Sequence, residues 1–398
     1  MERLKVIIVH PHLAIYGGAE TVIIKLAQYL KKKGVENAIL TLSISPQLLD
    51  NHNDLAFITP EKKYSYKVRS INFFSAMGLV NEILGLRTLI RKNVLSFDVI
   101  NVHNFPATWS IVSMNRPCVW TCNEPPDLWN NPTPSLPLRA ARDIGWQVDR
   151  IMVNNYITSI CVADEFNANR VLERYGRQSE IVPYGIEYDF FCKGDKESAV
   201  YKFDLEGKFV LLQVGYISPQ KNQLESINWV KRLKEHIPNI KLILAGSDTS
   251  PYARMCKAYV LRNNLENYVV FTGHLSKDSI RDLYHACDIL LHPVLQQGGW
   301  LAPFEALCAS KPIVVSCKMT ASNMITKEKI GVVTDNFIHA VFDIYKNPDK
   351  YLNMARKGKQ FVAKELTWEK FCEKTIRILE KAINTYIGSR HSIRGVGR

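Results

Sequence analysis

The chain of 398 residues lacks the features that mark several other classes of protein. No apolar run approaches the roughly 18 residues that a transmembrane helix needs. The N-terminal stretch MERLKVIIVHPH enters an apolar run directly and has none of the three regions of a signal peptide. The nine cysteines are scattered without a C-x-x-C pair, which argues against a disulfide framework and a zinc site. We therefore expect a globular protein of the reducing cytoplasm.

Recognition motifs for nucleic acid are also missing, although the chain is basic. Its formal net charge is +13 and its pI is about 9.2. No helix-turn-helix, RNA-recognition or zinc-finger pattern accompanies this charge, so we expect no nucleic-acid partner. The basic excess favours an anionic substrate or an anionic membrane surface as partner. It is concentrated late in the chain, at Lys350, Arg356, Lys357, Lys359, Lys364, Lys370, Lys374, Arg377, Lys381, Arg390, Arg394 and Arg398.

What the sequence does contain is a repeated alternation of apolar runs and helical patterns. The apolar runs, such as KVIIVH and KFVLLQVG, are continuous, as in parallel strands that are covered on both faces. At 398 residues the chain exceeds one ordinary core. We therefore predict an α/β protein with two Rossmann-like, doubly wound lobes. The predicted parts are lobes at 1–190 and 208–366, a polar linker at 191–207, an amphipathic helix at 367–387 and a disordered basic tail at 388–398.

In the first predicted lobe, candidate binding residues follow the carboxyl ends of strands, where open α/β sheets bind ligands. Gly17 and Gly18 form a turn between the first strand and the next helix, without the G-x-G-x-x-G spacing of a dinucleotide site. His103 falls at the carboxyl end of a strand, and Glu124 follows the next strand. Each residue also has a purely structural interpretation: chain reversal for the glycines, a hydrogen bond for the histidine and a solvated loop position for the acid.

The second predicted lobe holds the most informative stretch, residues 291–316. An apolar strand ends in a turn that contains Gly298 and Gly299, and a helix starts near Pro303 with Glu305 in its first turn. The start of a helix presents free N–H groups and partial positive charge, so this turn is a natural anion site. A carboxylate placed there to interact with the helix dipole is the alternative explanation of Glu305.

This stretch resembles the nucleotide-sugar site of retaining glycosyltransferases of family four. Residues 123–126 resemble the C-H-x-P-P-R stretch of the mannosyl- and rhamnosyl-transferase branch of that family, with Asn123 in place of histidine and Asp127 in place of arginine. The family signature is a glutamate, seven residues, a second glutamate and an alanine, which here reads Gln297, then Glu305 and Ala306. The resemblance covers about residues 4 to 385. It implies the GT-B fold, in which two lobes face a cleft and the last helix crosses back to the first lobe. It also implies transfer of a hexosyl unit from a nucleoside-diphosphate sugar, with retention.

The resemblance assigns donor-binding roles in the second lobe. Glu305 would hold the ribose hydroxyls, Gln297 would contact the donor sugar, and Lys221 would bind the diphosphate as a point charge. The other donor-binding candidates lie near the phosphates, sugar or base: Gly215, Gly273, His274, Gly298, Gly299, Trp300 and Leu301. Three positions depart from the family pattern, because Gln297 replaces an acid, Tyr216 replaces an arginine and Asn323 replaces an acid.

In the first lobe the resemblance places Gly17 and Gly18 against donor phosphate or acceptor. It places His103 beside the reacting centre, and Glu124 where it orients an acceptor hydroxyl or acts as base. His103, Glu124 and Gln297 are thus the catalytic candidates. The sequence has no Asp-x-Asp motif and no histidine cluster suited to a metal, so we expect no metal and no cofactor besides the nucleotide sugar.

We therefore expect a hexosyltransferase of glycan or cell-surface polysaccharide biosynthesis that uses GDP-mannose or a UDP-hexose. The expected acceptor is a saccharide or a polyprenyl-linked saccharide. The expected location is the cytoplasm, either free or bound peripherally to the cytoplasmic face of a membrane. Two alternatives stay open. The three substitutions fit a non-catalytic paralogue that binds a nucleotide or a partner protein. Sugar-nucleotide epimerases and phosphorylases share the same architecture.

Overall fold

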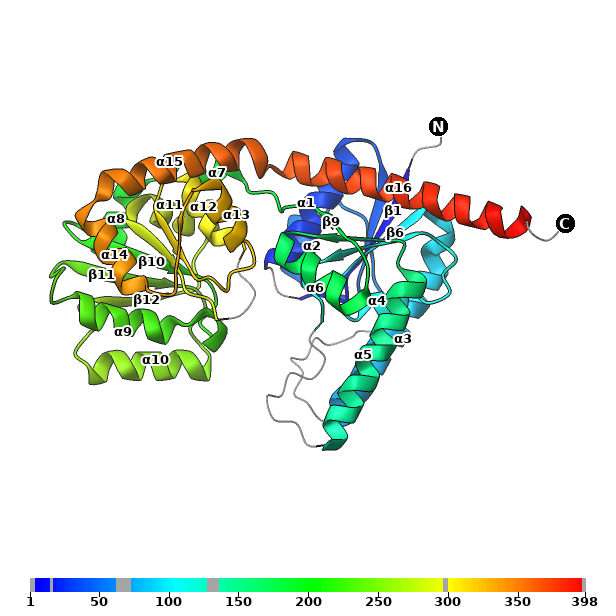
Figure 1. The fold of residues 1–398 in the computed structure, drawn as a ribbon, viewed down its shortest axis with the longest axis horizontal. Coiled ribbons are helices and arrows are strands. Elements are labelled where there is room, and N and C mark those ends of the chain that lie inside the picture. The colour runs from blue at the N-terminus through cyan, green and yellow to red at the C-terminus, as the bar shows by residue number, and fades with distance from the viewer. Residues whose placement is uncertain (1–3, 15–16, 62–72, 127–135, 296–299, 396–398) are drawn as a thin grey trace. The chain divides into compact units, whose positions relative to one another are not determined.

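The computed structural model divides the chain into two compact units (Figure 1). The first comprises Met1–Pro183 and Trp368–Arg398, and the second comprises Tyr184–Thr367. Each unit contains a parallel sheet with helices, which confirms the predicted α/β class with two lobes. The described residues are 4–14, 17–61, 73–126, 136–295 and 300–395.

The first unit is built on a seven-stranded parallel sheet in the order β5-β3-β1-β6-β7-β8-β9. Residues 6–9 of the central strand β1 are fully buried, as expected of an apolar run covered on both faces. The strands are β1 (Lys5–Val9), β3 (Glu36–Leu40), β5 (Phe57–Ile58), β6 (Val99–His103), β7 (Cys118–Cys122), β8 (Ser159–Val162) and β9 (Glu180–Ile181), and a separate parallel pair is formed by β2 (His12–Leu13) and β4 (Ser43–Ile44). The helices are α1 (Gly18–Lys32), α2 (Pro46–Asn51), α3 (Phe73–Asn93), α4 (Ala107–Ser110), α5 (Leu136–Tyr156), α6 (Glu165–Tyr175) and α16 (Trp368–Gly395).

The second unit repeats this plan with a six-stranded parallel sheet in the order β12-β11-β10-β13-β14-β15. Its strands are β10 (Phe209–Val214), β11 (Ile240–Ala245), β12 (Val269–Gly273), β13 (Ile289–His292), β14 (Ile313–Val315) and β15 (Val332–Val333). Its helices are α7 (Tyr188–Phe191), α8 (Lys196–Phe203), α9 (Gln223–Leu233), α10 (Pro251–Arg262), α11 (Lys277–Ala286), α12 (Leu301–Cys308), α13 (Ser322–Glu328), α14 (Phe337–Lys346) and α15 (Pro348–Glu365).

The last helix, α16, belongs to the first unit, as the fold prediction required. Its buried residues include Phe371 and Leu379. Tyr29 of α1 donates its hydroxyl to Glu373 at 3.3 Å. The predicted disordered tail from residue 388 is helical as far as Gly395. Gly388 costs such a helix only about 1 kcal/mol, which a helix that is already nucleated can carry.

The predicted linker at 191–207 is also wrong in part, because it contains the whole of α8. Asp195 caps this helix by accepting the Ser198 N–H at 3.0 Å. The polar stretch therefore encodes a helix start, since a side-chain cap satisfies a free amide there. The chain passes between the units at Pro183 and Tyr184, earlier than predicted. Within the described stretches, no helix combines the length and apolar character needed to cross a bilayer.

Candidate functional site

The topology of the second sheet points to one crevice. The chain runs outward from β10 through β11 to β12 and then returns to the other side of β10 with β13. In open α/β sheets a ligand binds at such a switch point, outside the carboxyl ends of the strands. The loops after β10 and β13 also contact each other, because the Leu295 N–H donates to the Gln220 carbonyl at 2.9 Å. Lys221 follows the first of these strands and α12 follows the second.

Glu305 lies in α12, but not in the first turn as predicted. The helix begins at Leu301, before Pro303, so Glu305 is its fifth residue and lies in the second turn. The interaction of a carboxylate with the helix dipole falls off beyond the first turn. The structural explanation of Glu305 as a dipole partner therefore loses its basis.

The Glu305 carboxylate has a defined environment. Tyr284 of α11 donates its hydroxyl to Glu305 Oε2 at 2.7 Å. Burial raises the pKa of Glu305, while the Tyr284 hydrogen bond and the positive charge of Lys277 act in the opposite direction. The flanking residues Phe304 and Ala306 are fully buried, so the helix holds this carboxylate in a fixed place.

Lys221 lies in the loop after β10, on one side of the switch point. It ends the short 3-10 helix Pro219–Lys221 that follows β10. Its backbone carbonyl accepts the Gln213 side-chain amide at 2.7 Å. Burial lowers the pKa of Lys221 to about 8. The ammonium of this half-buried lysine would gain stabilisation from an incoming anion, and its binding of a diphosphate stays a prediction.

Glycines at the carboxyl ends of β10, β11 and β12 let the backbones approach closely. Gly246, which the sequence analysis missed, has a φ of +156°, and a Cβ there would lie 2.1 Å from the Gly215 carbonyl oxygen. Gly246 N–H donates to the Gly273 carbonyl at 3.1 Å. Gly215 and Gly273 also have positive φ, at 137° and 68°. The predicted residues Gly215 and Gly273 thus lie along one edge, with His274 exposed beside Gly273.

The remaining donor-binding candidates are only partly described. Gln297, Gly298 and Gly299 lie outside the described residues. The Trp300 ring is buried against Tyr184 and Phe304, with ring centroids 5.3 and 4.8 Å away. The Trp300 side chain therefore serves the core of the second unit, which leaves the backbone as its predicted contact with a ligand. Leu301 is the first residue of α12.

In the first unit the switch point lies between β1 and β6, and His103 ends β6 as predicted. Its side chain is fully buried, however, and Nε2 is 2.8 Å from Asn101 Oδ1. Burial lowers the pKa of His103 to about 3, so the ring is neutral at physiological pH. Contact of this ring with a ligand stays a prediction, since the ring has no exposed surface here. Glu124 is exposed in the loop after β7.

A polar chain that the sequence analysis missed lies at the same edge. His10 Nε2 is 3.0 Å from Asn104 Nδ2, and Asn123 Nδ2 donates to Asn104 Oδ1 at 2.7 Å. Burial lowers the pKa of His10 to about 4, so its ring is neutral and Nε2 accepts from the Asn104 amide. The available signal was the position of His10 directly after the first strand, at the same carboxyl edge where His103 ends β6.

The start of α1 differs from the prediction for Gly17. The Gly17 N–H donates to Glu20 Oε2 at 3.0 Å, and Thr21 donates its hydroxyl to the Gly17 carbonyl. The Gly17 amide is therefore occupied by a carboxylate. A second anion, such as donor phosphate, is disfavoured next to it, which leaves acceptor contact as the better supported part of the prediction for Gly17 and Gly18.

Comparison with known families agrees with this architecture. Residues 195–361 match the model of the glycosyl transferases group 1, and residues 16–190 match that of glycosyltransferase family 4. Between them the two matches leave out only four residues of the interval 16–361. The chain therefore belongs to the family 4 glycosyltransferases, which have the GT-B fold.

Individual relatives are distant. The putative glycosyltransferase YtcC of Bacillus subtilis is 24% identical over 200 residues, which are 46% of this chain and 48% of that protein. The lipopolysaccharide 1,2-N-acetylglucosaminetransferase of Salmonella typhimurium is 23% identical over 210 residues, 49% and 54% of the two chains. The matches thus span about half the length of these curated relatives. The crystal structure of Anabaena Alr3699/HepE with UDP and glucose superposes with a TM-score of 0.78 at 15% identity, covering 95% of this chain and all of that one.

Proposed function

We propose that this protein transfers a hexosyl unit from a nucleoside-diphosphate sugar to a saccharide or lipid-linked saccharide acceptor, with retention, in glycan or cell-surface polysaccharide biosynthesis. The observation that carries the proposal is that Lys221 and Glu305 follow the two strands, β10 and β13, that flank one switch point of the second sheet. A half-buried lysine suits a diphosphate, and a half-buried carboxylate suits the vicinal hydroxyls of a ribose. These are the two invariant parts of any nucleoside-diphosphate sugar.

The chemistry of the proposed reaction is the departure of a diphosphate. Negative charge grows on the leaving oxygen, and groups that are already oriented toward it stabilise the transition state. Lys221 supplies a cation, and the first N–H groups of α12 supply oriented donors. We propose that this suffices without a metal ion. Chelation of divalent ions with EDTA should then leave the transfer rate unchanged, and loss of activity that magnesium or manganese restores would reject this part.

GDP-mannose and UDP-hexoses are the two candidate classes of donor. The family resemblance at residues 123–126 favours GDP-mannose. The solved structures of Anabaena Alr3699/HepE contain UDP or UDP-glucose, which supports a UDP-sugar. A thermal-shift series with nucleoside diphosphates and their sugars separates the two, because a nucleotide at 100 times its Kd stabilises a protein by about 2.7 kcal/mol. No shift with any nucleotide would reject the proposal.

The acceptor is proposed to be saccharide or lipid-linked, with anionic lipid as the surface on which the protein works. One relative is named as a galactosyltransferase that acts on a GlcNAc-diphosphoundecaprenol acceptor. The basic residues of α15 and α16 include exposed Lys357, Lys364 and Lys374. Each basic residue near anionic lipid contributes about 1 kcal/mol. Binding to vesicles that contain phosphatidylglycerol should weaken as salt is added, and absent or salt-insensitive binding would reject the membrane part.

The alternative, a non-catalytic paralogue, rests on the three substitutions at Gln297, Tyr216 and Asn323. Tyr216 follows Gly215 at the carboxyl end of β10 and is 55% exposed, where the family carries an arginine. Turnover decides between the two functions. If the protein hydrolyses or transfers a donor sugar and Glu305→Ala abolishes that turnover, the enzyme is supported. A protein that binds nucleotide but shows no turnover with any donor and acceptor would favour the paralogue.

A further inference from the structure

Tyr284 occupies one oxygen of the Glu305 carboxylate. Its hydroxyl donates to Oε2 at 2.7 Å, and its side chain is fully buried. A carboxylate offers about four lone-pair sites, so this bond leaves Oε1 and part of Oε2 for other donors. Without such a partner, the last torsion of a glutamate has a broad, roughly two-fold distribution. The Tyr284 hydroxyl therefore fixes the rotation of the carboxylate.

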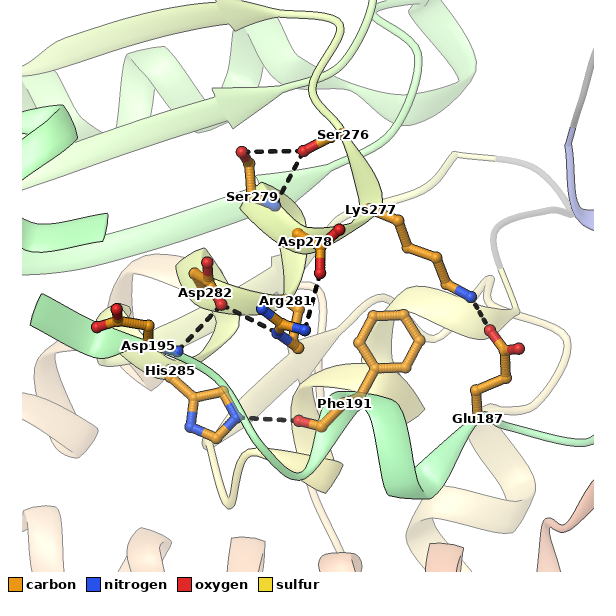
Figure 2. Close-up of polar contacts among 10 residues, drawn as sticks. All are labelled: Glu187, Phe191, Asp195, Ser276, Lys277, Asp278, Ser279, Arg281, Asp282 and His285. Carbon is orange, nitrogen blue, oxygen red and sulfur yellow. Dashed lines mark hydrogen bonds and ion pairs between the residues drawn. The ribbon is translucent and has the colours of Figure 1, made fainter. Parts of the chain in front are cut away.

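The Tyr284 ring is itself held in place by α7. Phe191 packs edge-on against it, with ring centroids 5.8 Å apart. Next to Tyr284, His285 Nε2 lies 2.9 Å from the Phe191 carbonyl, which ties α11 to α7 (Figure 2). Gly194 makes room for His285, because a Cβ there would lie 2.3 Å from the His285 ring. The position of the Tyr284 hydroxyl is thus fixed by the packing of its ring on Phe191 and by the contacts of His285 with Phe191 and Gly194.

The charged groups around Glu305 also come from α11. Lys277, at the start of that helix, forms an ion pair with Glu187 (Figure 2). Its charge favours the ionised form of Glu305, as the Tyr284 hydrogen bond does, against the effect of burial. The Cys308 thiol faces the carboxylate from α12 itself, and burial together with Glu305 raises the pKa of this thiol, so it stays neutral. Tyr284 and Lys277 are therefore the groups that keep Glu305 ionised.

We propose that Tyr284 is a positioning residue for the donor, whose hydroxyl turns the free edge of Glu305 toward the 2′- and 3′-hydroxyls of the ribose. The inference rests on the proposed function, because it takes Glu305 as the ribose ligand. Fixing the carboxylate before the donor arrives removes part of the ordering cost of binding. Tyr284 does not touch the donor, so its effect passes through Glu305 alone.

The first test is calorimetric titration of Tyr284→Phe with UDP, GDP and ADP and with their 2′-deoxy forms. Phenylalanine keeps the ring and its contact with Phe191 but lacks the hydroxyl. The ribonucleotide that wild type binds best should bind about tenfold more weakly, as for loss of a hydrogen bond to a charged group. The 2′-deoxy form should lose less, so the preference for ribose over deoxyribose should fall. Tyr259→Phe is the matched control, because its hydroxyl bonds Asn228 at 3.2 Å on a different pair of helices.

The second test is the pH dependence of nucleotide binding. Removing the Tyr284 hydroxyl removes an interaction that lowers the pKa of Glu305, so the pKa rises in the variant. The ionised carboxylate is then lost at a higher pH, and the acid limb of the affinity profile should move upward in Tyr284→Phe. Glu305→Gln should lack this limb, and Tyr259→Phe should keep it at the wild-type position.

The outcomes separate this inference from the proposed function. Tyr284→Phe with wild-type ribose preference and an unmoved acid limb would overturn the role of Tyr284 while the donor site survives. An equal loss for ribonucleotide and 2′-deoxynucleotide, together with a lower Tm, would show a merely structural role and would also overturn it. If wild type binds none of the nucleotides, or if Glu305→Ala binds them with unchanged affinity, the proposed function fails and this inference fails with it.

Discussion

The carboxyl edges of the two sheets are built differently, although both sheets follow the same winding. The carboxyl edge of the second sheet, which we call the donor edge after the proposed function, consists of Lys221, the start of α12 and backbones brought together by glycines such as Gly246. The carboxyl edge of the first sheet, which we call the acceptor edge for the same reason, consists of side-chain amides and two neutral histidines, His10 and His103.

The two edges differ in charge as well as in construction. The donor edge presents a cation and the positive end of a helix, whereas on the acceptor edge a carboxylate, Glu20, accepts from the N–H of Gly17, the residue that precedes the corresponding helix α1. A diphosphate therefore fits the first of these edges and is disfavoured at the second, which instead suits uncharged hydroxyl groups. The shared fold does not decide this; the residues at the edge do.

Replacing the cation of the donor edge should have the largest effect on activity. Lys221→Met removes the cation of the donor edge, and the growing charge on the diphosphate loses a preorganised partner. We expect kcat/KM for the donor to fall about 100-fold to 1000-fold, as for loss of one oriented electrostatic group. Steady-state kinetics of Lys221→Met and of the control Lys231→Met measure this fall. Lys231 is a suitable control because it lies on α9 and donates to Asn263. A loss below fivefold in Lys221→Met would contradict a charged donor edge.

The neutral histidines of the acceptor edge should make the first unit sensitive to acid. Burial lowers the pKa of His10 to about 4, below the usual 6.5, so between these values only the unfolded chain binds the proton. The contribution of the neutral His10 ring to the free energy of unfolding is fully present above pH 6.5 and is lost as the pH falls toward 4. At pH 4.5 this loss is about 2–3 kcal/mol.

This difference is measurable in the wild type and in His10→Gln by hydrogen exchange of the β1 amides at pH 7.5 and 4.5. After correction for the intrinsic exchange rates, the free energy of opening should fall more steeply with acid in the wild type than in the variant. Equal pH dependence in the two proteins would show that His10 is not held neutral by burial, and the contrast in charge between the edges would lose one of its supports.

The general plan of the molecule was predictable from the sequence for a physical reason. Continuous apolar runs such as residues 5–10 specify strands that are buried on both faces, and their alternation with helical patterns leaves parallel sheets as the consistent architecture. The positions of Lys221 after β10 and of His103 at the end of β6 followed from the same alternation of strands and helices. Local signals of this kind are contained within a few neighbouring residues.

The features that the sequence did not predict depend on contacts between distant residues. The bond between Tyr284 and Glu305 joins two helices, and the pair formed by Gly215 and Gly246 depends on the register of β10 and β11. The start of α12 was misplaced by two residues, because Pro303 is accepted anywhere in the first turn and so does not mark the first residue. An error of two residues is about half a helical turn, and here it moves Glu305 from the first turn to the second.

Adding a methyl group at Gly246 should test whether the donor edge depends on the close approach of its backbones. A Cβ at Gly246 would lie 2.1 Å from the Gly215 carbonyl oxygen, so Gly246→Ala must push β10 and β11 apart at their ends. We expect unfolding to become about 2 kcal/mol easier, as for overpacking, with weaker nucleotide binding as well. Gly207→Ala is the control for backbone strain alone, because Gly207 has a φ of +63° and no atoms near its Cβ position. Equal losses in urea unfolding for both variants would mean that the close approach has no role.

The smallest expected effect concerns Gln297, where the family carries an acid. Relative to that acid, glutamine carries no negative charge, and it keeps the capacity to hydrogen-bond a sugar hydroxyl. If the side chain touches the donor sugar, Gln297→Ala should lower kcat/KM about tenfold, or about 1.4 kcal/mol. Gln47→Ala, at an exposed position on α2, should leave kcat/KM unchanged. Kinetics of Gln297→Ala that match those of Gln47→Ala would remove Gln297 from the donor site and leave the charge of that edge to Lys221 and Glu305.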